Sequence, residues 1–146
     1  MTNDSCTNVP KPKARACGAL VRDDCILMVQ HREPKRTYWT LPGGAVEPGE
    51  TPEEATAREF LEETHAKVRV VRLIRQHIHH GPNGPWDDYM FPVEAEDVAG
   101  SDDVRLGFDP EEAHLPVTDR TLTDVRWIPL TEMREDGQIR EVIASI

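Results

Sequence analysis

A proline- and glycine-rich run that ends in a strongly marked helix start constrains this chain more than any other feature. The run LPGGAVEPGE, residues 41–50, is too irregular for an interior strand or helix, so we expect a shaped loop. Directly after it, Thr51 can cap a helix, Pro52 suits the first helical position, and Glu54 completes a capping box. The sequence therefore predicts a loop that leads straight into a helix.

This helix carries Glu59, Glu62 and Glu63 at the i, i+3, i+4 spacing. Because successive helical residues are rotated by about 100°, the three carboxylates are expected on one face. Like charges at this spacing destabilise a helix, so a cation is expected against them. An ordinary solvated surface is the alternative, but residues 50–63 mostly lack the Lys or Arg partners that such a surface carries.

The opposite side of the same helix is expected to pack on a sheet while the glutamates face outward. The residues predicted for this packed side are Ala57, Phe60, Leu61 and Thr64.

Apolar alternation and turn signals predict the remaining elements. Residues 15–33 contain two strands broken by a hairpin turn at Arg22-Asp23-Asp24, and the C-terminal helix is interrupted near Gly137. The other expected elements are strands at 67–79, 89–95 and 125–129, a turn at 80–85, a long acidic segment at 97–119, and the C-terminal helix at 131–145.

Length and charge set limits on the class of protein. The 146 residues suit one domain, expected at 14–146 after a flexible tail at 1–13. A net charge of −10 argues against broad binding of nucleic acid or an anionic membrane. A small phosphorylated substrate remains compatible, because a bound divalent cation can reverse the local sign of an acidic cleft.

The cysteines and the absence of long apolar runs indicate the compartment. Cys6, Cys17 and Cys25 are odd in number and form no C-x-x-C pair, which favours reduced thiols. No stretch approaches the roughly 18 apolar residues of a membrane span, and the N-terminus lacks the apolar core of a signal peptide. We expect a soluble, cytoplasmic protein.

The spacing around the helix forms a recognisable signature. From Gly44 the chain runs through five residues to Glu50, then seven more to REFLEETHA, residues 58–66. This resembles the signature of the Nudix (MutT-like) hydrolase family at every charged position, and WTLPGG before it resembles the family's lead-in. The departure is His65, where the family has glycine. Histidine adopts a left-handed helix end at a cost of about 1 kcal/mol, so we expect only a local change.

The resemblance implies an α/β fold: a Nudix-type α/β/α sandwich with a mixed central sheet, the glutamate helix on one side and the C-terminal helix on another. It implies hydrolysis of a pyrophosphate bond in a nucleoside diphosphate linked to another group, by attack of water on phosphorus. The expected cofactor is Mg²⁺ or Mn²⁺, since these ions prefer oxygen ligands and can bridge carboxylates to phosphates.

Roles follow by resemblance, residue by residue. Glu59, Glu62 and Glu63 resemble the metal ligands and catalytic carboxylates, and Arg58 resembles the residue that orients a neighbouring glutamate. The predicted supporting groups are the backbone carbonyl of Gly43 as a further ligand, Glu50 as an outer ligand or loop brace, and Glu111 or Glu112 as a base from the acidic segment.

The residues that could contact the substrate have two interpretations. In the basic cluster at 31–36, Arg32 and Arg36 suit substrate phosphates, but a plain solvated loop explains them equally well. Trp86 can stack on a nucleobase or pack in the core. Core packing is the default for Trp39, Tyr89 and Trp127.

Other functions stay in consideration. A nucleotide-sensing module with the same fold is the main alternative, although such modules usually lose signature carboxylates. A structural zinc site at His77, His79 and His80 is weaker, because a strand end explains them. Nucleoside triphosphates, ADP-ribose and nucleotide sugars all remain as candidate substrates. Pro82 resembles a marker residue of ADP-ribose hydrolases, but a proline there also suits a turn. The resemblance leaves a homodimer open.

Overall fold

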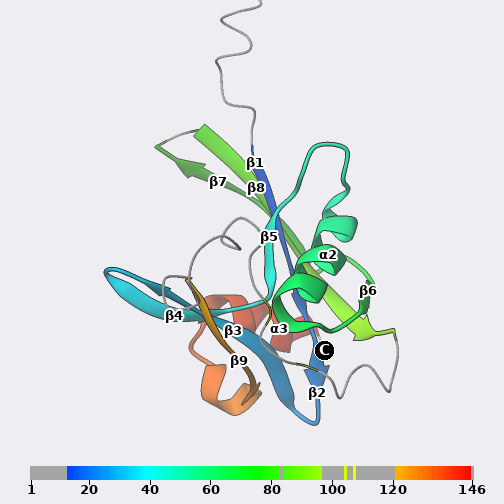
Figure 1. Cartoon of the computed structure of the whole chain (residues 1–146), viewed down its shortest axis with the longest axis vertical. Helices are drawn as coiled ribbons and strands as arrows, with labels where there is room; N and C mark the ends of the chain where they lie inside the picture. The colour runs from blue at the N-terminus through cyan, green and yellow to red at the C-terminus, as the bar shows by residue number, and fades with distance from the viewer. Residues whose placement is uncertain (1–12, 83, 97–103, 105–106, 108–120, 146) are drawn as a thin grey trace, which may run out of the picture.

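The computed structural model describes residues 13–82, 84–96, 104, 107 and 121–145 (Figure 1). The predicted tail, apart from Lys13, lies outside this range, and so does the acidic segment apart from Val104 and Gly107. The elements in chain order are β1 (Lys13–Ala19), β2 (Val21–Arg22), β3 (Cys25–Glu33), β4 (Arg36–Thr40), β5 (Gly43–Ala45), α2 (Pro52–Thr64), β6 (Val68–Val70), β7 (Arg75–Gly81), β8 (Gly84–Ala95), β9 (Leu122–Pro129), the 3₁₀ helix η4 (Leu130–Met133) and α3 (Gly137–Ser145).

The strands form two sheets. A five-stranded mixed sheet has the order β5-β1-β8-β6 with β7 also paired to β8, and β1 runs parallel to β8. A four-stranded antiparallel sheet has the order β2-β3-β4 with β9 paired to β3. The predicted mixed sheet is confirmed, and the second sheet is an addition to that prediction.

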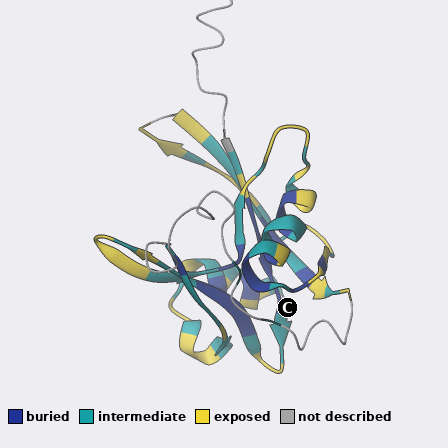
Figure 2. Ribbon diagram, viewed as in Figure 1, coloured by how far each residue is buried: buried dark blue, intermediate teal, exposed yellow. Residues whose placement is uncertain are grey.

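Successive residues of the central strands belong to two different apolar clusters, because side chains alternate between the faces of a strand. The cluster that α2 covers includes Ala16, Leu27, Phe60 and Phe91, whereas the cluster that α3 covers includes Cys17, Met28, Met90 and Ile139. Both faces of the sheets are therefore buried at their centres, while the outer ends of the β3–β4 and β7–β8 hairpins are exposed (Figure 2). This arrangement is the predicted α/β/α sandwich.

The turn between β2 and β3 confirms the predicted hairpin. Asp23 and Asp24 both have positive φ, 52° and 59°. A two-residue turn with this backbone matches the twist of the flanking strands, and aspartate is one of the few side chains that tolerates it. Val21 pairs with Ile26 across the turn.

The strand predicted over residues 67–79 is wrong in one respect, because it is two strands. Val70 pairs with Val93 of β8 and Arg75 with Met90, so residues 71–74 bulge opposite residues 91–92. Pro92 lies at this point and has no N–H to donate to the ladder, which explains the break.

Two further strands were not expected. Residues 43–45 of the loop pair antiparallel with β1 at the edge of the mixed sheet, where a short irregular strand is tolerated. The basic cluster lies on a β3–β4 hairpin with a turn at residues 34–35, because the β-prone segment after it pairs with β3. The C-terminal helix is interrupted as predicted, into η4 and α3. No helix in the described residues is long and apolar enough to cross a membrane.

Candidate active site

Local sequence signals set the two ends of α2. The Thr51 hydroxyl accepts the Glu54 N–H at 3.1 Å, and the Glu54 carboxylate accepts the Thr51 N–H at 2.9 Å, so the predicted capping box is present. At the other end His65 has φ of 62° and donates its N–H to the Leu61 carbonyl at 3.0 Å. The departure from the family glycine is therefore accommodated at the helix end, as expected.

The packed face of α2 differs from the predicted one. Leu61 is 43% exposed, whereas Glu63 is only 4% exposed. At about 100° per residue, Glu63 falls between Ala55 and Thr56 on the inner stripe, and Leu61 falls outside it. The buried residues of the helix are Ala55, Thr56, Phe60, Glu63 and Thr64. The expectation that all three glutamates look outward is wrong for Glu63, because helical rotation rather than polarity decides its direction.

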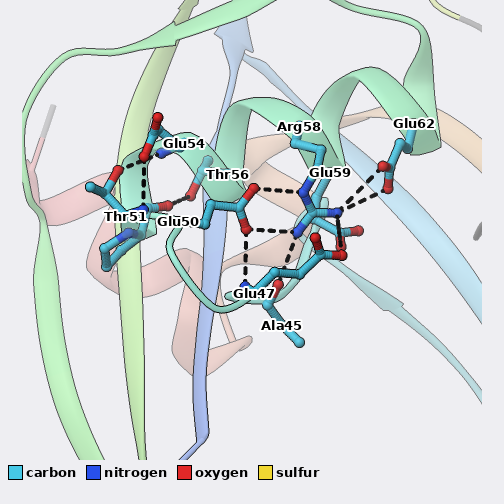
Figure 3. Close-up of polar contacts among 10 residues, drawn as sticks. Ala45, Glu47, Glu50, Thr51, Glu54, Thr56, Arg58, Glu59 and Glu62 are labelled. Atoms are coloured by element: carbon cyan, nitrogen blue, oxygen red, sulfur yellow. Dashed lines mark hydrogen bonds and ion pairs between the residues drawn. The ribbon is translucent and has the colours of Figure 1, made fainter.

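Arg58 lies at the centre of the carboxylate face (Figure 3). Its guanidinium donates to both oxygens of Glu50, from Nε at 2.7 Å and from Nη2 at 3.0 Å. Nη1 donates to Glu59 at 2.9 Å and to Glu62 at 3.2 Å, and Nη2 also donates to the Ala45 carbonyl at 3.0 Å. One cation thus joins the loop before the helix to two of the predicted metal ligands.

The electrostatics of this network favour its ionised form. The hydrogen bonds from Arg58 lower the pKa of Glu50, and the hydrogen bond to Glu50 is the main cause of the raised pKa of Arg58. The side chains of Glu50 and Glu59 are 15% and 16% exposed, so these charge-assisted bonds are partly shielded from water. Glu50 also accepts the Glu47 N–H at 3.0 Å, which makes it a brace of the loop.

Two glycines bring the loop against the glutamates. The Gly43 N–H donates to the Glu63 carboxylate at 3.0 Å. A Cβ on Gly44 would lie 2.6 Å from the Glu59 carboxyl carbon, closer than real Cβ contacts allow. The absence of a side chain at Gly44 therefore lets the backbone approach the Glu59 carboxylate, whereas at Gly43 it lets the loop lie against Ala16 and Cys17 of β1.

A divalent cation fits this face by its chemistry. Within the described part of the chain, no three His, Cys, Asp or Glu side chains form a preassembled metal-binding group. However, Glu59 and Glu62 contact the same guanidinium nitrogen, which shows that their oxygens converge where positive charge is accepted. Carboxylate oxygens are the donors that Mg²⁺ and Mn²⁺ prefer.

The predicted phosphate contacts lie elsewhere. Arg32 and Arg36 belong to the β3–β4 hairpin, whose outer end points away from α2 (Figure 1). Arg36 donates to Glu33 at 3.0 Å, and its guanidinium lies 4.3 Å from the ring centroid of Tyr38. Glu111 and Glu112 lie outside the described residues.

The aromatic and histidine residues that the sequence offered as candidates lie in strands. Trp86 lies in β8 rather than in a turn, and its ring stacks on His79 at 4.2 Å. His79 Nε2 lies 3.2 Å from the Asp88 carboxylate. Trp39, Tyr89 and Trp127 are partly buried against the apolar clusters, as expected for core packing. Trp39 and Trp127 also line a hollow of about 380 Å³ beside η4.

Sequence reasoning missed two groups that touch the glutamate helix. The Ala45 carbonyl accepts from Arg58, and the Gly107 N–H donates to the Glu63 carbonyl at 2.7 Å. The irregular loop gave a signal for Ala45, but nothing in the local sequence marks Gly107, because its partner is distant along the chain.

Comparisons with known proteins agree with this geometry. The family model described as NUDIX domain matches residues 12–146. The chain is 34% identical over 91 residues to the NAD-capped RNA hydrolase NudC of Photorhabdus laumondii, covering 62% of this chain and 32% of NudC. It is 30% identical over 122 residues to the putative ADP-ribose pyrophosphatase YjhB of Bacillus subtilis, covering 78% of this chain and 58% of YjhB.

The chain thus spans less than two thirds of the length of these curated relatives. A solved structure with a similar fold is the MutT NUDIX hydrolase from Burkholderia pseudomallei, with a TM-score of 0.60 and 25% identity, covering 84% of this chain and 86% of that one. The carboxylate signature, the sandwich fold and the match over residues 12–146 agree, and the chain belongs to the Nudix hydrolase family.

Proposed function

We propose that this chain is a divalent-metal-dependent hydrolase that cleaves the pyrophosphate bond of a nucleoside diphosphate linked to another group. The observation that carries the proposal is the convergence of Glu59 and Glu62 on one guanidinium nitrogen of Arg58. The two carboxylates come from successive turns of one helix, and both ends of that helix are capped. Such a face supplies the negative charge that a metal-phosphate substrate requires.

The glutamates have distinct roles in this proposal. Glu59, Glu62 and Glu63 would hold Mg²⁺ or Mn²⁺, with the Gly43 carbonyl as a further ligand. The bound ion would offset phosphate charge and lower the pKa of a water molecule. Arg58 keeps Glu59 and Glu62 oriented, and Glu50 in turn holds Arg58 through both of its oxygens.

We infer the substrate class from two of the relatives that the chain resembles. YjhB of Bacillus subtilis is described as a putative ADP-ribose pyrophosphatase, and its match covers 78% of this chain. NudC is described as a hydrolase of NAD-capped RNA. Both descriptions name a nucleoside diphosphate joined to a second group, so ADP-ribose heads the substrates to test, with nucleotide sugars and nucleoside triphosphates beside it.

The test is product release from ADP-ribose, NAD, nucleotide sugars, dinucleoside polyphosphates and nucleoside triphosphates, each with Mg²⁺ or Mn²⁺. The products should separate a monophosphate from free phosphate or pyrophosphate. We expect turnover on one class of substrate, with loss of turnover after EDTA treatment and in Glu62→Gln. Tight binding of a substrate without any product at saturating Mn²⁺ would contradict hydrolysis and favour the sensing module.

A further inference from the structure

Gly107 makes a close backbone contact with the last turn of α2. Its N–H donates to the Glu63 carbonyl at 2.7 Å. A Cβ built on Gly107 would overlap the Glu62 carbonyl oxygen and would lie 2.8 Å from the Glu62 carbonyl carbon. Only glycine can occupy this position without displacing the backbone on one side of the contact.

This contact supplies a partner that the helix lacks. The last four carbonyls of an α-helix have no N–H donor within the helix. The His65 N–H donates to the Leu61 carbonyl, and the Gly107 N–H donates to the Glu63 carbonyl. The backbone of Glu63 is therefore held by Gly107, a residue outside the signature.

Glu63 is thus held by two glycines from separate parts of the chain. Gly43 holds its side chain through a hydrogen bond of 3.0 Å, and Gly107 holds its backbone. Val104, three residues earlier in the chain, packs on the apolar cluster that α2 covers. A displacement at residue 107 would be transmitted directly to the peptide units of Glu62 and Glu63.

We propose that Gly107 is a positioning residue for the metal-binding carboxylates. It holds the last turn of α2 in the rotation that directs Glu62 and Glu63 to the site. This inference rests on the proposed function, because it assigns Gly107 an effect on the metal that those glutamates would hold. Residues that orient metal ligands commonly alter metal affinity by about 10- to 100-fold when replaced.

The test compares three substitutions: Gly107→Ala, Val104→Ala and Gly137→Ala. Gly137 is the matched control, because a Cβ there meets nothing within 4 Å. Val104→Ala removes apolar packing three residues before Gly107 without altering the hydrogen bond to the Glu63 carbonyl. The measurements are the Mn²⁺ dissociation constant by electron paramagnetic resonance, the melting temperature without metal, and kcat and KM with saturating Mn²⁺.

Gly107→Ala is expected to weaken Mn²⁺ binding about 10- to 100-fold and to lower kcat with little change in KM. Val104→Ala should lower the melting temperature but keep the Mn²⁺ affinity, and Gly137→Ala should keep both. Equal Mn²⁺ affinity in the Gly107 and Gly137 variants would overturn the inference while leaving the proposed function intact. A wild-type protein that binds no Mn²⁺ would overturn both.

A second measurement covers the case in which Gly107→Ala does not fold. Amide hydrogen exchange of the wild-type protein is followed with and without Mg²⁺. Because coupling between two sites is reciprocal, Mg²⁺ should increase the protection of the Gly107 amide but not of the Gly137 amide. Metal binding without any change at Gly107 would contradict the proposal.

Discussion

Arg58 and Arg36 both form hydrogen bonds with a nearby glutamate, but they do so in different environments. The Arg58 side chain is 25% exposed and contacts Glu50, Glu59 and Glu62, which are themselves at most about a quarter exposed. The Arg36 side chain is 67% exposed and its partner Glu33 is 40% exposed. Arg58 joins a loop to a helix (Figure 3), whereas Arg36 and Glu33 lie on either side of one hairpin turn.

The two pairs differ in exposure and in the segments that they join, and these two properties determine whether an ion pair can organise a site. An exposed pair is screened by water and loses side-chain entropy when it forms, so it contributes little to stability. A partly shielded pair between separate segments determines where those segments lie.

Replacement of the glutamates themselves should have the largest effect. Glu62→Gln and Glu63→Gln should each lower turnover by orders of magnitude, because each removes a charge that is proposed to hold the metal. In Glu63→Gln the new amide oxygen can still accept the Gly43 N–H, so the fold should persist. Steady-state kinetics measure the loss, and circular dichroism checks the fold. Near-normal turnover in both variants would refute the assignment.

Conservative replacement of the two arginines should affect Mn²⁺ affinity differently, because their environments differ. Arg58→Lys removes the planar fork that contacts Glu50 through two nitrogens, and we expect Mn²⁺ affinity to fall about 10- to 100-fold. Arg36→Lys should leave Mn²⁺ affinity unchanged. Calorimetric titration with Mn²⁺ measures both. An equal response of the two variants would mean that the Arg58 network does not orient the glutamates.

Acid should weaken the Arg58 network through Glu50. Its pKa is lowered in the folded protein from an ordinary value of 4.5, mainly by the hydrogen bond from Arg58. The stability from this shift is complete above the unfolded-state pKa and is lost as the pH falls through the lowered folded-state pKa. Urea unfolding between neutral pH and strongly acidic pH should show a shallower loss for Glu50→Gln than for the wild type. Identical slopes would contradict the lowered pKa.

The smallest effect is expected at the hairpin end. Arg36→Ala should leave the melting temperature unchanged, because an exposed pair contributes little. The same variant tests the predicted phosphate contact, since a rise in KM at a constant melting temperature would support that role. An unchanged KM would assign Arg36 to a solvated hairpin. A marked fall in melting temperature would show that this exposed ion pair does stabilise the fold.

The loop and helix could be predicted because their signals are local. Thr51 and Glu54 are three positions apart, and each recognises the other's backbone without help from the fold. The two aspartates of the β2–β3 turn likewise specify a hairpin by their own backbone preferences. Strand ends were less predictable, because the division near Val70 depends on Pro92 in a strand that comes later in the chain.

The sequence by itself determined the helix, its caps and the spacing of its charged residues, because these depend on neighbours within about one turn. Packing of the helix on the sheets, in contrast, is what buries Glu63, brings Arg58 to Glu50 across the loop and places Gly107 at the end of α2. The Gly107 contact joins segments that lie far apart in sequence, and the Arg58 contact spans the eight residues between the loop and the helix. Their formation depends on which backbone groups the packed sheets bring together, and local residue preferences do not encode that outcome.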